Sequence, residues 1–313
     1  MRNYIYSIAL LAVILVVAGA CKKEAALTPS TGNIGYVLPQ GNNSYDTTIL
    51  NYYKKYGCYL LYKFTGKDTY WTPTGWKNAY TDTASVAHTG YVAQQATEAY
   101  VSKQLSLINK LWFSYYSDKF LKDFLPAKIM LSSTVDSGYI GFVSTPTFHT
   151  VLLTKAVAAW YNYDNICVNN ARAVIDSMSA RDSITYLGKV NLVFMQSIAG
   201  RNLANPTSDF ASATNYAATI SSTAAQYAAG ILFIYYNGPT AAKDWGMYMQ
   251  AMVSTSETRL NKSTVATDAT FSGILNATKD VNGVIRKRYN IIRNYFINTY
   301  NVDLQAIGNA ADQ

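Results

Sequence analysis

The sequence predicts an α+β fold, in which a small N-terminal sheet packs on a mainly helical domain with one buried central helix. Strand patterns come first along the chain and helical patterns follow, which is the order expected of that class. The chain has 313 residues, of which 50% are hydrophobic and 14% charged. A chain of this length can bury a large core without crosslinks. The composition also excludes a disordered or collagen-like protein.

Residues 1–20 have the pattern of a secretory signal peptide. Arg2 precedes an uncharged apolar run over residues 5–17, and small residues then lead to Cys21. The run is too short to span a bilayer as a helix. Cys21 stands where a bacterial lipoprotein signal places its acylated cysteine, so we expect cleavage before Cys21 and attachment of lipid to its thiol. An ordinary cleaved signal and an uncleaved anchor are the alternatives.

The part of the chain after the signal divides into a tether and a folded domain. Residues 21–44 are rich in Gly and Pro, and we expect them to form a flexible tether. Residues 45–313 are expected to form a single domain. Several acyl chains on Cys21 would hold this domain at a membrane surface.

Local patterns predict the elements of the domain. Short apolar runs bounded by turn residues predict strands at 57–64, 127–133 and 138–144. Residues 148–160 are apolar almost all round, which predicts a helix buried in the middle of the domain. Apolar residues at helical spacing predict further helices at 92–125, 165–180, 184–198, 209–229, 240–253 and 282–300.

The formal net charge of +8 raises the question of a nucleic-acid partner. The densest basic cluster consists of Arg286, Lys287, Arg288 and Arg293 on a predicted helix, and a solvated helix face explains it. No nucleic-acid-binding motif accompanies the cluster, so we predict no nucleic-acid partner.

Two cysteines remain besides Cys21. Cys58 and Cys167 either form a disulfide or stay reduced as small buried hydrophobic residues, and their spacing does not decide between these alternatives.

Several short segments resemble one family of proteins. They comprise Pro126-Ala127-Lys128, His149-Thr150, residues 200–210, residues 291–296 and residues 301–304. These segments are similar to the substrate-import-associated zinc metallohydrolase lipoproteins of Bacteroidetes. The resemblance implies a gluzincin-type (zincin-like, metallopeptidase-like) fold, a lipid anchor on the outer membrane facing the cell surface, and a place beside a TonB-dependent nutrient import system.

The chemistry of that family depends on a zinc site that this sequence lacks. Such a site needs a His-Glu-x-x-His motif on a helix and a third, acidic ligand, which together leave one zinc position for water. The resemblance places these positions at Leu153, Thr154, Val157 and Ser212. None of the four can serve as a zinc-binding imidazole or a carboxylate base, and the chain contains no His-Glu-x-x-His in any register. We therefore expect a pseudoenzyme without catalytic residues, metal or cofactor; His88 and His149 have no acidic neighbours at ligand spacing.

Aromatic side chains are the remaining candidates for a binding role. Flat aromatic faces suit sugar rings and peptide side chains, and the candidates are Tyr70, Trp71, Trp76, Tyr161 and Tyr163. They predict a non-catalytic binding or accessory protein with a glycan or peptide ligand. The same aromatics could instead pack the core. The alternative functions are a structural or adhesive lipoprotein without a small ligand, and a hydrolase that uses other residues.

Overall fold

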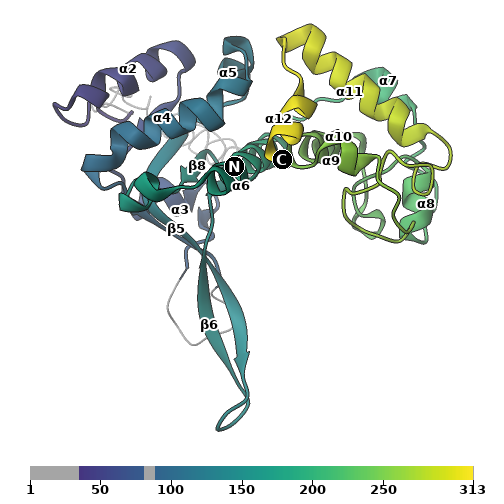
Figure 1. Ribbon diagram of the computed structural model, residues 1–313, viewed down its shortest axis with the longest axis horizontal. Helices are drawn as coiled ribbons and strands as arrows, with labels where there is room; N and C mark the ends of the chain where they lie inside the picture. Colours follow the sequence, from purple (N-terminus) through teal and green to yellow (C-terminus); the bar gives the residue numbers. More distant parts are fainter. Residues whose placement is uncertain (1–34, 81–88, 313) are drawn as a thin grey trace, which may run out of the picture. The chain divides into compact units, whose positions relative to one another are not determined.

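The computed structural model describes residues 35–80 and 89–312. The predicted signal peptide, Cys21 and most of the predicted tether lie outside these ranges, as does His88. From Leu38 to the C-terminus the chain forms one compact unit. This unit has the predicted α+β architecture, a small sheet packed on helices (Figure 1). Within residues 35–80 and 89–312, no helix is long and apolar enough to cross a membrane.

The sheet is organised around the 16-residue strand β5, Lys128–Val143. Its first half pairs in parallel with β1, Tyr59–Leu61, on one side and with β8, Asn165–Val168, on the other. β7, Ala159–Asn162, adds an antiparallel strand beside β8. Residues 128–133 of β5 are all buried, as expected of a strand covered on both faces of a parallel sheet.

Beyond Leu131, β5 changes partners. It pairs with β4, Tyr91–Gln95, along residues 132–137 and with β6, His149–Ala156, along residues 136–143, both antiparallel. Figure 1 shows β5 and β6 extending together as a hairpin away from the helices. The prediction of a buried helix at 148–160 is therefore wrong, because these residues form β6 and then β7. An apolar run has no periodicity that separates a buried helix from a strand, and its β-branched residues favour the strand.

The central helix of the fold is α6, Ala180–Gly200, which contains the helix predicted at 184–198. Ser179 caps it, because its hydroxyl accepts a hydrogen bond from the Asp182 amide while the Asp182 carboxylate accepts one from the Ser179 amide. α6 packs on β7, on α9 (Ala241–Ser254) and on α12 (Leu304–Ala311). The helix predicted at 165–180 is wrong, since β8 and a short 3-10 helix occupy those residues.

The remaining helices, turns and short strands complete the domain. The longer helices are α2 (Ser44–Tyr56), α4 (Val101–Leu111), α5 (Asp118–Phe124) and α11 (Val284–Tyr300). The short helices are α3 (Gly66–Tyr70), α7 (Ser208–Ser212), α8 (Thr223–Ala228) and α10 (Glu257–Leu260). 3-10 turns lie at Glu98–Tyr100, Phe113–Tyr115, Ala173–Ser177 and Tyr235–Asn237, and a two-stranded ribbon joins β2 (Trp71–Thr72) to β3 (Gly75–Trp76).

Several tyrosines lie in the core, which accounts for part of the 27 tyrosines in the chain. Tyr116, for example, stacks on Phe120 with ring centroids 4.7 Å apart, and its hydroxyl donates to Asn191 Oδ1 at 2.8 Å. Buried tyrosine hydroxyls usually need such a partner. Cys58 and Cys167 are also buried, and both thiols are free rather than joined in a disulfide.

Candidate functional site

A pocket of ≈ 630 Å³ lies between the β2–β3 ribbon, β7 and the C-terminal half of α6. The ribbon contributes Pro73 and Thr74, β7 and its turn contribute Tyr161 and Tyr163, and α6 contributes Gln196 and Gly200. Gly200 has no side chain, and this leaves room for the Tyr161 ring, which forms part of the pocket wall. A Cβ there would lie 2.9 Å from Cε2 of Tyr161, so only glycine lets this ring lie against the end of α6.

Stacked aromatic rings form another wall of the pocket. Trp160 lines it and stacks on Tyr91 with ring centroids 4.6 Å apart, and on Tyr70 at 5.8 Å. The Tyr70 hydroxyl accepts a hydrogen bond from the Ala93 amide at 2.9 Å. Tyr70 therefore fixes Trp160 in place from outside the pocket lining.

Some polar groups of the pocket are already engaged within the fold. Asn162 accepts from Asn78 Nδ2 at 3.2 Å and donates to the Thr69 carbonyl at 3.0 Å. The Thr72 hydroxyl donates to the Gly75 carbonyl at 2.9 Å. The bonds of Asn162 join β7 to Thr69 and Asn78 on either side of the ribbon, and the Thr72 bond lies within the ribbon, so these groups are not available to a ligand without rearrangement.

Other polar groups are available. Within the described part of the chain, the side chains of Lys77, Tyr161, Tyr163 and Gln196 make no hydrogen bond to protein. Burial raises the pKa of Tyr161, so its hydroxyl stays protonated near neutral pH. The pocket thus offers amide and hydroxyl groups that both donate and accept hydrogen bonds, and one ammonium group that only donates.

The described lining of the pocket contains no carboxylate, imidazole or thiol group. Among the described residues that line the pocket there is no Asp, Glu, His or Cys. Gln196 and Gly200 lie one helical turn apart on the wall formed by α6, which is the relation that the two histidines of a His-Glu-x-x-His motif need. A carboxamide and a glycine stand there instead. Elsewhere in residues 35–80 and 89–312, no three His, Cys, Asp or Glu residues are placed to hold a metal ion.

The predicted aromatic candidates separate into three groups. Tyr161 and Tyr163 line the pocket, and Tyr70 supports it through Trp160. Trp71 and Trp76 face each other across the ribbon and are 46% and 61% exposed, but neither lines the pocket. The reason is that side chains alternate along a strand, so the neighbouring Thr72 and Lys77 point to the pocket side.

The predicted zinc-motif positions do not form a site. Leu153 and Thr154 lie on the exposed strand β6 and Val157 follows it, so no helix brings them one turn apart. Ser212 ends α7, where its hydroxyl donates to the Asp209 carbonyl. His149 is also exposed on β6, with Nδ1 2.8 Å from the Thr147 carbonyl. Sequence reasoning missed Gln196 and Gly200, because no motif marks them and only the packing of β7 on α6 shows that they line a pocket.

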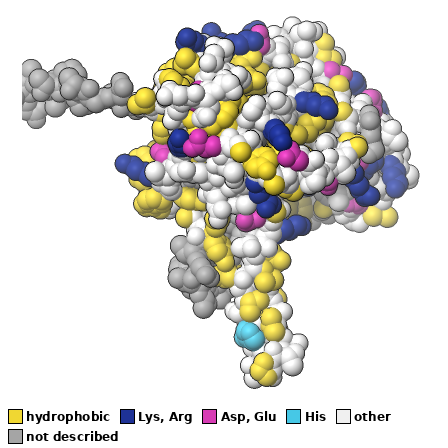
Figure 2. Space-filling model, turned by 60° about the vertical axis from the view of Figure 1, so that its left-hand side comes forward, with side chains coloured by type: hydrophobic (Ala, Val, Ile, Leu, Met, Phe, Trp, Pro, Cys, Tyr) yellow, Lys and Arg dark blue, Asp and Glu magenta, His cyan; other side chains and the backbone are white. Residues whose placement is uncertain are grey.

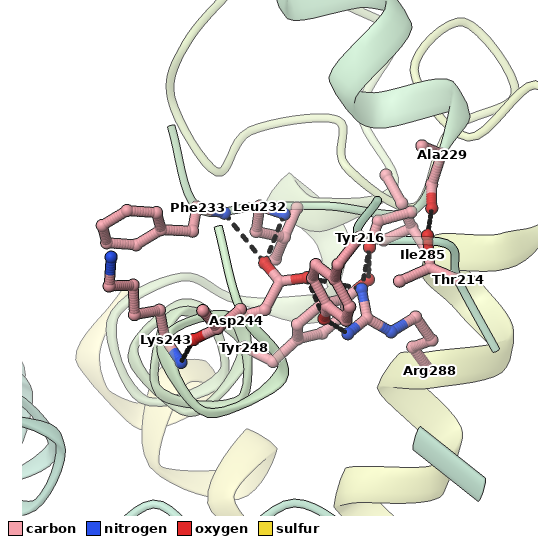
Figure 3. A network of polar contacts seen from close by, with 12 residues as sticks. Thr214, Tyr216, Ala229, Leu232, Phe233, Lys243, Asp244, Tyr248, Ile285 and Arg288 are labelled. Carbon is pink, nitrogen blue, oxygen red and sulfur yellow. Dashed lines mark hydrogen bonds and ion pairs between the residues drawn. The ribbon is translucent and has the colours of Figure 1, made fainter. Parts of the chain in front are cut away.

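A second polar cluster joins α9 to α11. The Asp244 carboxylate binds the Arg288 guanidinium and also accepts from the amides of Leu232 and Phe233 at 2.7 and 2.8 Å. Arg288 also donates to the Gly230 carbonyl and to the Tyr216 hydroxyl. Figure 3 shows the side chains of Asp244, Tyr216 and Arg288 pointing toward one another.

This cluster has a structural role and not a ligand-binding one. Both charged side chains are 0% exposed, so no ligand reaches them without unfolding of the region. The prediction that Arg288 belongs to a solvated helix face is wrong. The sequence pattern could not show this, because its acidic partner Asp244 lies far away in the chain.

Comparison with known proteins gives one weak likeness. No protein-family model and no curated protein matches the chain. A solved structure of a "putative zinc-binding metallo-peptidase" from Bacteroides caccae is similar over 84% of this chain and 88% of that chain, with 11% identity and a TM-score of 0.43. At that identity and TM-score, the similarity does not support any conclusion about function. Membership of the hydrolase lipoprotein family therefore stays a prediction.

Proposed function

We propose that this protein is a non-catalytic, zincin-like surface lipoprotein that binds a glycan or a peptide in the pocket between the β2–β3 ribbon, β7 and α6. The observation that carries this proposal is the composition of the pocket lining. It combines aromatic rings with unengaged amide and hydroxyl groups, and its described residues include no Asp, Glu, His or Cys. Such a lining suits recognition and lacks the metal ligands and the carboxylate base that a zinc hydrolase uses.

The relation of Gln196 to Gly200 supports the pseudoenzyme part of the proposal. These two residues have the spacing and the pocket exposure that a zinc-binding helix needs. Neither is an imidazole, and the residue after Gln196 is Ser197 rather than glutamate. A hydrolase scaffold whose metal ligands have been replaced would have this composition.

The aromatic and polar groups support the binding part. Tyr163 is 58% exposed, so its ring is accessible at the pocket mouth, and aromatic rings contribute large contact areas to sugar and peptide complexes. Gln196 and Tyr161 supply hydrogen-bonding groups that match sugar hydroxyls or a peptide backbone. Lys77 would favour a ligand with an anionic group near the ribbon.

A binding screen tests the pocket. The chain from residue 21 onward, carrying Cys21→Ser, is screened against glycan and peptide arrays, and the Kd of each ligand found is measured. We expect Tyr163→Ala and Gln196→Ala each to weaken binding by about tenfold or more, as pocket residues at the centre of an interface do.

The matched controls are Tyr236→Ala, which removes an exposed tyrosine (68%, against 58% for Tyr163) outside the pocket, and Trp71→Ala on the other face of the ribbon. Both should leave Kd unchanged. If Trp71→Ala abolishes binding and Gln196→Ala does not, the ligand lies on the ribbon and the assignment to the pocket is wrong. If nothing binds, the structural or adhesive alternative is favoured.

The location is a separate part of the proposal. Cys21 is the proposed lipidation site. The proposed location is the outer membrane, beside a TonB-dependent nutrient importer. These proposals rest on the sequence and its family resemblance. Metabolic labelling with a fatty acid should mark the parent protein and not a Cys21→Ala variant. Co-purification from detergent-solubilised outer membranes should then recover an import protein with the parent.

A further inference from the structure

The outer part of the β5–β6 hairpin is an uncharged, exposed surface. Residues 137–154 contain no Asp, Glu, Lys or Arg. β4 pairs with β5 only up to Ser137, and beyond that point β5 and β6 pair with each other. We call residues 139–153 the hairpin tip. Figure 2 shows hydrophobic side chains along this projecting part of the molecule.

Aromatic and aliphatic side chains cover the hairpin tip. Phe142 and Phe148 are 67% and 72% exposed, and their rings stack with centroids 5.6 Å apart. Tyr139 and Leu153, directly opposite each other in the register, are 44% and 42% exposed. Exposed apolar side chains gathered in this way usually mark a contact with a partner or a membrane.

Both faces of the hairpin tip carry exposed apolar side chains. Successive side chains of a strand point to opposite faces, so the pair Tyr139 and Leu153 lies on one face and Phe142 lies on the other. A groove on a protein partner would cover one of these faces and leave the other in water. The surface of a lipid bilayer surrounds an inserted tip and contacts both.

We propose that the hairpin tip inserts into the headgroup region of a lipid bilayer and acts as a second membrane contact beside the lipid on Cys21. The backbone of β6 limits how deeply the hairpin tip can insert into the bilayer. Within the described residues β6 pairs only with β5, so its outer edge carries backbone groups that need water or headgroups and would be costly in the hydrocarbon core.

The length of chain outside the structure fits this placement. Cys21 lies 17 residues before Leu38, where the compact unit begins. Fully extended, that segment reaches roughly 60 Å at most. A lipid anchor at Cys21 would therefore keep the folded unit within reach of the bilayer. A single weak contact of this kind gains strength when it acts together with an acyl anchor.

Vesicle flotation tests the proposal independently of the pocket. The chain from residue 21 onward with Cys21→Ser, which lacks the acylation site, is mixed with neutral phosphatidylcholine vesicles at high salt. Neutral lipid and high salt suppress binding that depends only on the net positive charge. We expect measurable partitioning that falls at least about tenfold in the double variant Phe142→Ser/Phe148→Ser.

The matched control is Tyr236→Ser/Val265→Ser, which removes two side chains that are each 68% exposed elsewhere on the surface. It should float as the parent does. A second readout keeps every apolar side chain of the tip: Thr147→Cys is labelled with an environment-sensitive dye. The emission of this dye should shift to the blue when vesicles are added. The proposal is overturned if the parent does not bind neutral vesicles, if the phenylalanine variant binds equally well, or if the parent is a dimer that the variant dissociates.

Discussion

Asp244 on α9 and Arg288 on α11 form an ion pair with both side chains fully buried. The Arg288 guanidinium also lies 3.8 Å over the ring centroid of Phe210 on α7. A buried guanidinium is tolerated only when hydrogen bonds and aromatic contact replace its hydration. The pair therefore ties α7, α9, α11 and the 230–233 segment together.

Removal of one partner of this pair should be strongly destabilising. Arg288→Met leaves the Asp244 carboxylate buried without its counter-charge, and such changes cost about 3–5 kcal/mol. Urea denaturation should show this loss in the free energy of unfolding. The control is the exposed pair Lys103 and Asp176, 54% and 48% exposed, where Lys103→Met should cost at most about 1 kcal/mol. Equal effects at both pairs would contradict the structural role of Asp244 and Arg288.

The close approach of Gly200 to Tyr161 predicts a coupled pair of mutations. Gly200→Ala places a methyl group 2.9 Å from the Tyr161 ring, and overpacking of this kind costs about 1–3 kcal/mol. In a Tyr161→Ala background the same change should be neutral, or stabilising by up to about 1 kcal/mol through helix propensity. A double-mutant cycle measured by urea denaturation checks this. Additive effects would mean that the two residues do not contact.

Buried tyrosines predict a loss of stability in alkali. Burial raises the pKa of Tyr116, Tyr186 and Tyr248, whereas the pKa in the unfolded chain is about 10. The folded state thus favours the neutral form. The contribution of these buried tyrosines to the free energy of unfolding is fully present below about pH 10. It is lost as the pH rises from there through their raised pKa in the folded state. The free energy of unfolding should fall steeply above about pH 10.

Tyr186 provides the control for that titration. Its hydroxyl is buried and has no hydrogen-bond partner among the described residues. Tyr186→Phe should therefore keep the stability at neutral pH and reduce the alkaline loss. Ionisation of every tyrosine near its ordinary pKa without unfolding, followed by ultraviolet absorbance, would show that these hydroxyls are not buried.

The cysteines should be unreactive in the native protein. Cys58 and Cys167 are free, and burial raises the pKa of both thiols, so little thiolate is present for reaction. A thiol reagent should detect neither in the native Cys21→Ser chain and both after denaturation. A mass that rises by two hydrogens on reduction would instead reveal a disulfide.

Sequence reasoning reached the fold class and several helices because those depend on local signals. α6 is an example, since its apolar pattern at 184–198 is long and periodic. β6 is not evident from the sequence because residues 148–160 form a largely apolar run, and such a run fits a buried helix as well as a strand.

The candidate site was reached only in part. Tyr161 and Tyr163 were found from residue type and lie in the pocket, but Trp71 and Trp76 point away from it. Whether a residue faces a pocket depends on strand register and on distant packing. Gln196 is separated from the ribbon by more than a hundred residues, so no local pattern could connect them.

The most direct test of the central claim is the Kd of a ligand for the pocket, measured with excess EDTA and with excess zinc. A non-catalytic pocket without metal ligands predicts the same Kd in both conditions for the parent, a weaker Kd for Gln196→Ala, and no cleavage of the ligand. Binding or cleavage that requires zinc, together with one tightly held zinc ion per chain, would contradict the account.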